Sequence, residues 1–209
     1  MNFEKALRFP VTEQNGLVKV IIGAVISLIP IVNFISMGYL IKLMGNIIKG
    51  EESMPEWTDI GDKFVQGIMA AIITFIYMLI PFIIMMAGGG LGTMARGGMA
   101  ALFTSFLLAF IVAIIIGFFL PMALANFVGK GNFGAAFDFS TIIDYLKRAF
   151  NNYFIAYIVI IGLYIVLGII GIIPLIGWII GILGGFYISC VAAFLFGSIY
   201  RDVSRSQSR

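Results

Sequence analysis

A long stretch with no charged residue, from Gly97 to Gly129, limits most strongly what this chain can fold into. Large apolar residues fill most of it, and every fourth position holds a small residue or a proline: Gly97, Ala101, Ser105, Ala109, Ala113, Gly117, Pro121, Ala125 and Gly129. A helix that is apolar on all sides belongs in a membrane or in a deep core. In lipid, small residues in a row let another helix approach closely. The stretch therefore predicts a membrane helix whose contact residues include Ala109, Ala113 and Gly117.

The composition extends this conclusion to the whole chain. The sequence is 61% hydrophobic and only 11% charged, and its mean hydropathy is +1.10. Soluble domains carry about 25% charged residues, so we expect an all-α integral membrane protein. The 209 residues have room for about six short spans and little else. We therefore predict a single transmembrane domain over residues 1–209. No cleavage site follows the first apolar run, so we expect that run to be retained.

Proline marks the turns between the apolar segments. Ile173-Pro174 joins two apolar segments with no charge between them, and a nearly identical string surrounds Pro30. Because proline removes a helical hydrogen bond and disfavours helix at the residue before it, each string predicts a tight turn. Residues 17–48 would extend about 48 Å as one helix, which is too long for one crossing and too short for two full ones. One span, two spans and a re-entrant hairpin are the alternatives there, and we favour six hydrophobic segments arranged as three helical hairpins.

The layout suggests an internal repeat in which a short interfacial helix precedes each hairpin. The expected units cover about residues 1–49, 50–128 and 129–200, followed by a basic tail at 201–209. The first interfacial helix is expected to end at Pro10. Thr141 and Asp144 have the spacing of a helix-capping pair for a later one.

Charge predicts the topology. With six segments, both termini, residues 50–63 and residues 128–150 lie on one side. That side holds every Lys and Arg except Arg96, if Lys19 and Lys42 are counted as extending from the membrane toward its headgroups. The positive-inside rule makes this side cytoplasmic. We therefore expect a multi-pass protein of the cytoplasmic cell membrane with both termini inside. A five-span alternative would place the basic residues of the amino terminus outside.

The last apolar segment carries a second row of small residues. Gly177, Gly181 and Gly185 fall four apart, and Ser189, Ala193 and Gly197 continue the spacing. We expect the three glycines to be helix-packing positions. Whether they face another part of the same chain or a second copy is open.

An acidic loop with a tryptophan follows the first apolar stretch. Its notable residues are Glu51, Glu52, Pro55, Glu56, Trp57 and Asp59. Carboxylates at this density can bind a cation or a basic partner segment, but they also suit a solvated loop before a helix amino terminus. Trp57 is typical of an anchor in the headgroup layer. We treat the loop as a possible partner-docking site.

The residue types argue against several kinds of chemistry. The chain has no histidine, its one cysteine is Cys190, and Arg96 is the only charge between Phe64 and Lys130. Proton-coupled and voltage-driven devices need ionisable groups inside the bilayer, and enzymes need a base or an activated nucleophile. We therefore expect no enzyme, cofactor, metal site or nucleic-acid partner.

The acidic loop and its neighbours resemble a known family. Gly38-Tyr39-Leu40, Gly50-Glu51-Glu52-x-x-Pro55-Glu56-Trp57 and Phe64-Val65-x-Gly67 are similar to the signature of an uncharacterised membrane family, domain of unknown function 4013. The Ile-Pro turn and the hairpin layout resemble, more loosely, the membrane domain of some glycerophosphodiester phosphodiesterases. Neither resemblance implies catalytic residues.

Two function classes follow from these patterns. The first, which we favour, is a helical-bundle scaffold or interaction subunit, partnered by the lipid bilayer and by another copy or another membrane protein. The second is a transport or lipid-handling subunit with a cavity for an apolar ligand. A cavity between the hairpins would favour the second class, and an exposed face of small residues would favour the first.

Overall fold

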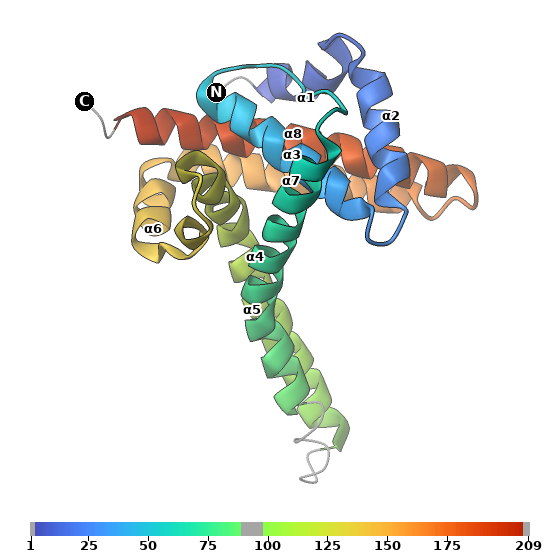
Figure 1. The fold of residues 1–209 in the computed structure, drawn as a ribbon. Helices are drawn as coiled ribbons and strands as arrows, with labels where there is room; N and C mark the ends of the chain where they lie inside the picture. The colour runs from blue at the N-terminus through green and yellow to red at the C-terminus, as the bar shows by residue number, and fades with distance from the viewer. Residues whose placement is uncertain (1–2, 89–97, 207–209) are drawn as a thin grey trace. The chain divides into compact units, whose positions relative to one another are not determined.

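The computed structural model describes residues 3–88 and 98–206, and all its regular secondary structure is helical, with no strand in those ranges. The elements are α1 (Phe3–Thr12), α2 (Gly16–Ser27), α3 (Asn33–Lys49), α4 (Ile60–Met86), α5 (Gly98–Lys130), a 3-10 helix (Phe133–Phe137), α6 (Phe139–Arg148), α7 (Phe150–Ile170) and α8 (Ile176–Ser206) (Figure 1). The predicted all-α class is confirmed for the described residues.

Four of these helices, α4, α5, α7 and α8, are long and apolar enough to span a membrane. Within the most apolar window of α4, α5 and α7, only 17–22% of the residues are buried. Their large apolar side chains therefore face outward, as expected for helices surrounded by lipid. The helices α2 and α3 have 12 and 17 residues, or about 18 and 26 Å, which is less than the roughly 30 Å of a hydrocarbon core. Six segments in three hairpins therefore stays a prediction.

Both proline strings form turns. Helix α2 ends at Ser27 and α3 begins at Asn33, so residues 17–48 do not form one straight helix. The residue after each proline takes a left-handed backbone conformation, with φ of 72° at Ile31 and 63° at Leu175. This conformation is costly for a side chain branched at Cβ, such as that of Ile31.

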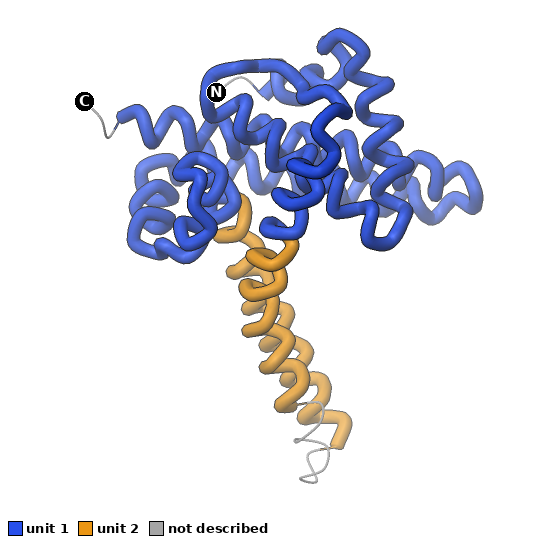
Figure 2. Tube along the Cα trace, in the orientation of Figure 1, with its two compact units in different colours: residues 1–70, 122–209 blue, residues 71–121 orange. Residues whose placement is uncertain are grey.

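The chain divides into two compact units, shown in Figure 2. Unit 1 comprises residues 1–70 and 122–209, and unit 2 comprises residues 71–121. In unit 2, segments of α4 and α5 run alongside each other, and a Cβ added at Gly88 would overlap the Ser105 side chain. These boundaries differ from those of the three repeated units, which remain a prediction. Gly97 and Arg96 lie outside the described residues.

Helix α8 is the centre of unit 1. It packs against α1, α2, α3, α6 and α7 (Figure 1). Residues 190–200 of this helix are almost entirely buried, including Cys190, Val191, Leu195 and Tyr200. The chain therefore uses its last helix as the core around which the earlier helices are assembled.

The closest helix approach in unit 1 depends on two glycines of α3 and α4. A Cβ added at Gly38 would overlap the backbone carbonyl of Lys63, and one added at Gly67 would overlap the carbonyl of Phe34. The obstruction is backbone in both cases, so a side chain cannot move aside to relieve it. Glycine at these two positions sets the spacing of α3 and the start of α4.

Two local predictions about the short helices are wrong. Helix α1 does not end at Pro10 but continues to Thr12, because proline removes only its own donor and the Glu13 amide still bonds the Phe9 carbonyl at 3.2 Å. Helix α6 is capped by Asp138 rather than by Thr141. The Asp138 carboxylate accepts a hydrogen bond from the Thr141 amide at 3.1 Å, so Thr141 lies inside the first turn.

Candidate functional site

The acidic loop, residues 50–59, lies as a strap across α2 and α3. Met54 and Pro55 are buried. The buried Lys19 ammonium lies 2.7 Å from the Glu56 carboxylate and donates to the Met54 carbonyl at 3.1 Å. The Trp57 indole N–H donates to the Lys19 carbonyl at 3.1 Å. Lys19 of α2 therefore contacts three residues of the strap, Met54, Glu56 and Trp57.

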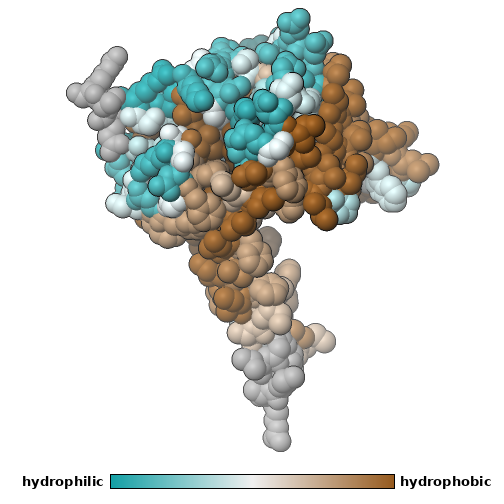
Figure 3. Space-filling view, in the orientation of Figure 1, coloured by the Kyte–Doolittle hydropathy of each residue, from teal (hydrophilic) through white to brown (hydrophobic). Residues whose placement is uncertain are grey.

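Aromatic contacts hold the strap on its other side. The ring of Trp57 stacks on that of Tyr39, with centroids 4.2 Å apart and planes inclined by 14°. Phe186 of α8 lies within 6.3 Å of both rings. Trp57 is therefore packed inside the protein's own fold. Figure 3 shows hydrophilic residues gathered over the strap, while hydrophobic residues cover α2 and the turn between α7 and α8.

Most carboxylates of the strap pair with bases of the same chain. Glu52 contacts Lys5 and lies 4.0 Å from Arg201. Asp59 and the nearby Asp62 lie 3.9 and 3.1 Å from the Lys42 ammonium. The exposed Glu51 carboxylate is the exception, since it has no ion pair with any described residue. Within residues 3–88 and 98–206, no cluster of three or more Cys, Asp or Glu side chains has the arrangement of a metal site.

Two adjoining cavities lie among the apolar helices of unit 1. The first, of about 360 Å³, separates the α2–α3 pair from the α7–α8 pair, and we call it the polar cavity. The second, of about 500 Å³, runs along α7 and α8, and we call it the glycine groove because Gly168, Gly171, Gly177 and Gly181 line it. Tyr164, Gly181 and Ile182 line both. The two spaces therefore form one continuous depression.

The polar cavity carries hydroxyl and amide groups but no charge. Its polar lining residues are Ser27, Asn33, Ser36, Tyr164 and Ser189. The hydroxyls are satisfied within the protein: Ser36 donates to the Gly23 carbonyl at 2.9 Å, and the Tyr164 and Ser189 oxygens lie 3.0 Å apart. The Asn33 Oδ1 atom is buried and has no hydrogen-bond partner among the described residues. Such a group gains free energy when a donor reaches it, because an unpaired buried acceptor is costly.

The predicted small-residue positions differ in their surroundings. In unit 2, Ala109 is buried, and Ala113 and Gly117 are half-buried. In unit 1, Gly177 is buried against the backbone of the turn after α7. A Cβ added at Gly181 or Gly185 would meet nothing within 4 Å. Gly181 and Gly185 therefore border open space, and they line the cavities instead of contacting another helix.

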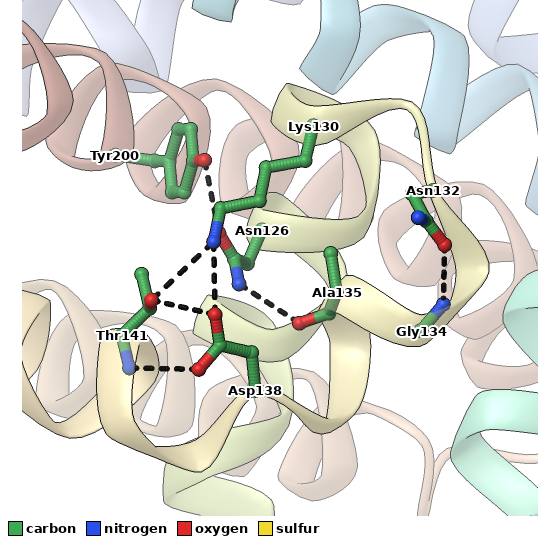
Figure 4. A network of polar contacts seen from close by, with 8 residues as sticks. All are labelled: Asn126, Lys130, Asn132, Gly134, Ala135, Asp138, Thr141 and Tyr200. Atoms are coloured by element: carbon green, nitrogen blue, oxygen red, sulfur yellow. Dashed lines mark hydrogen bonds and ion pairs between the residues drawn. The ribbon is translucent and has the colours of Figure 1, made fainter.

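A polar network holds the amphipathic helix α6 beside the end of α5 (Figure 4). The Lys130 ammonium lies 2.9 Å from the Asp138 carboxylate, which also accepts the Thr141 hydroxyl proton at 2.6 Å. These bonds lower the pKa of the Asp138 carboxyl to about 2, and the bond from the Thr141 hydroxyl has the largest effect. Beside them, Asn126 donates to the Ala135 carbonyl at 2.8 Å and accepts from the Tyr200 hydroxyl at 3.0 Å.

The comparison with known families matches residues 22–176 to the family described as "Protein of unknown function (DUF4013)". This range includes the strap, both proline turns and the glycines of the α3–α4 contact. The chain belongs to the DUF4013 family. The resemblance based on the strap and its neighbours is thereby confirmed, and the likeness to phosphodiesterase membrane domains is not shown.

One relative of this DUF4013 chain is an uncharacterised protein of Methanocaldococcus jannaschii. The two are 27% identical over 148 residues, which are 69% of this chain and 50% of the relative. The chain thus spans about half the length of that protein. No solved structure gives a significant match.

The sequence patterns did not indicate several residues that build these sites. Lys19 was expected to reach toward the headgroups, yet it is 5% exposed and holds the strap. Asn33 and Ser36 gave no signal, because single polar residues in an apolar run are common. Gly38 and Gly67 were quoted only as parts of a family signature, and their role depends on a contact between segments distant in the sequence.

Proposed function

We propose that this DUF4013 chain is a membrane protein that binds a lipid-like ligand in the depression formed by the polar cavity and the glycine groove. The observation that supports the proposal most is the polar cavity itself, a space of about 360 Å³ between two pairs of apolar helices. Concave sites lined by apolar groups and a few convergent polar groups are typical of ligand pockets. Of the two function classes, this favours the lipid-handling one over the scaffold.

The lining predicts the chemistry of the ligand. Gly168 and Gly181 line the glycine groove with open space beside them, so an alkyl chain has room to lie against the backbone of α7 and α8 there. The polar cavity has no charged lining residue to neutralise an ion. Because an unpaired charge is costly away from water, we propose an uncharged polar end such as a hydroxyl or an amide.

The experiment is native mass spectrometry of the protein released gently from its own membrane. We expect a monomer that carries one stoichiometric lipid or apolar molecule. Gly181→Leu should abolish this adduct, because the new side chain occupies the space shared by both cavities. Gly162→Leu is the matched control, since Gly162 lies on α7 with open space around it and lines neither cavity. An adduct that survives Gly181→Leu would place the ligand elsewhere and contradict the proposal.

A scaffold is the second candidate, and the open space at Gly181 and Gly185 favours it. A helix of a second copy or of another membrane protein can approach α8 closely at these positions, because glycine has no side chain to keep it away. The exposed carboxylate of Glu51 is the part of the strap left for a soluble partner, since Glu52, Glu56 and Asp59 have bases of the same chain beside them. A defined multimer or a co-purifying protein in the same experiment would support this candidate.

The proposed topology is six segments in three hairpins, with the strap and both termini on the cytoplasmic side. The strap gathers Lys5, Lys19, Lys42 and Arg201 around it. A concentration of bases on one side of a membrane protein is typical of the cytoplasmic face. The proposal includes no catalysis, because the chain has no histidine and its single thiol, Cys190, is buried.

A further inference from the structure

A third cavity of unit 1 lies apart from the depression described above. It has a volume of about 460 Å³ and is formed by the second half of α3, the beginning of α4 and the end of α5. Its polar lining residues are Lys42, Asn46, Lys49, Asp62 and Gln66. Its apolar lining residues include Ile41, Ile48, Met69, Phe127 and Val128. The cavity is therefore amphiphilic, with basic and apolar walls facing one space.

The charges of this cavity leave an excess of one positive charge. Two lysines and one aspartate line it, and Lys42 is paired with Asp62 at 3.1 Å. Asp62 also accepts a hydrogen bond from the Gln66 amide at 2.9 Å. Asp59, which does not line the cavity, lies 3.9 Å from the same lysine.

The second lysine has no such partner. The exposed Lys49 ammonium forms no ion pair with any described residue, and Arg205 donates to the Lys49 carbonyl at 3.2 Å, which brings a further base to this edge. The lining thus suits a single negative charge placed next to Lys49.

The apolar wall indicates where that negative charge comes from. A free phosphate ion gains nothing from Phe127, Val128 and Met69, whereas a phospholipid places its acyl chains against such residues. The cavity also lies near the ends of α4 and α5, two helices that are apolar enough to span a membrane. Basic pockets between such helices on the cytoplasmic side bind anionic headgroups.

We propose that this cavity is a binding site for the phosphodiester headgroup of an anionic phospholipid, with Lys49 as its main cationic contact. Lys42 of α3 pairs with Asp62 of α4 and so keeps these two sides of the cavity together. The proposal does not depend on the neutral ligand of the polar cavity, because the two cavities share no lining residue.

The test is native mass spectrometry of the delipidated protein with phosphatidylglycerol or phosphatidylcholine of the same acyl chains. We expect one phosphatidylglycerol to be retained in preference to phosphatidylcholine, and Lys49→Gln to weaken its binding about fivefold. Lys147→Gln is the matched control, because Lys147 is an exposed lysine of α6 outside the cavity. An equal loss in both variants would reduce the effect to general surface attraction and overturn the site.

A second arm distinguishes the lipid from a soluble phosphate. Glycerophosphoglycerol, the headgroup without acyl chains, should compete only weakly because it cannot use the apolar wall. Competition at concentrations similar to those of the lipid would identify a soluble phosphodiester and overturn the lipid assignment. Gly181→Leu should leave phosphatidylglycerol binding unchanged, so failure of the polar-cavity proposal is distinguishable from failure of this one.

Discussion

At the scale of residues, Gly38 and Gly67 show how a missing side chain sets the distance between two helices. Each backbone is so close to a carbonyl of the other segment that a Cβ would overlap it. The open positions Gly162, Gly181 and Gly185 lack this constraint. Spacing in the sequence does not separate the two classes, because both occur in apolar helices.

This contrast makes a prediction about alanine. We expect Gly67→Ala to lower stability by about 2 kcal/mol, because the added methyl group forces a backbone shift in a packed contact. Gly162→Ala should leave stability unchanged or raise it by up to about 1 kcal/mol, since alanine is the better helix former and the space is open. Thermal unfolding of both variants in the same detergent measures the difference. Equal melting temperatures would contradict the assigned role of Gly67.

At the scale of elements, the strap is a loop whose charges are used mainly within the chain. The sequence showed a dense acidic segment, and a partner or a cation was a reasonable reading of it. In the structure, Lys19, Lys42 and Lys5 come from three different helices to meet Glu56, Asp59 and Glu52. An acidic cluster looks the same in sequence whether its bases belong to a partner or to distant parts of the same chain.

A pair of substitutions in the strap tests this use of charge. Glu56→Gln should destabilise the protein by about 1–2 kcal/mol, because it leaves the buried Lys19 ammonium without its counter-charge. The figure is below that for a fully buried pair because the Glu56 side chain is 70% exposed. Glu51→Gln should change stability by less than about 0.5 kcal/mol, as expected of an exposed residue without an ion pair. Loss of stability only in Glu51→Gln, measured by thermal unfolding, would reverse this assignment.

At the scale of the whole molecule, the proposed topology follows from the side on which the strap and its bases lie. A reporter that is active only in the cytoplasm should be active when fused to the amino terminus and equally when fused to the carboxyl terminus. Activity at the carboxyl terminus alone would mean an odd number of crossings and would restore the five-span alternative. The measurement uses the protein in its own membrane, where the positive-inside bias operates.

The sequence by itself indicated apolar helices long enough to span a membrane, the two proline turns and the family. These properties are local: an apolar run of sufficient length needs lipid whatever its neighbours are. The two Ile-Pro strings stand between apolar runs, and proline disfavours helix at the residue before it. Capping was predicted less well, since Asp138 and Thr141 both lie at the start of α6 and only the backbone geometry selects the capping residue.

Only the tertiary structure decided which glycines are in contact, where the strap's charges go and where cavities remain. Each of these depends on segments far apart in the chain, such as Lys19 and Glu56 or Ser36 and Ser189. A row of small residues indicates that another helix can approach closely. Whether a helix, a ligand or nothing occupies that space is set by the packing of the other helices. The depression of the polar cavity and glycine groove therefore arises from how α2, α3, α7 and α8 are assembled, and the third cavity from the packing of α3 beside the start of α4 and the end of α5.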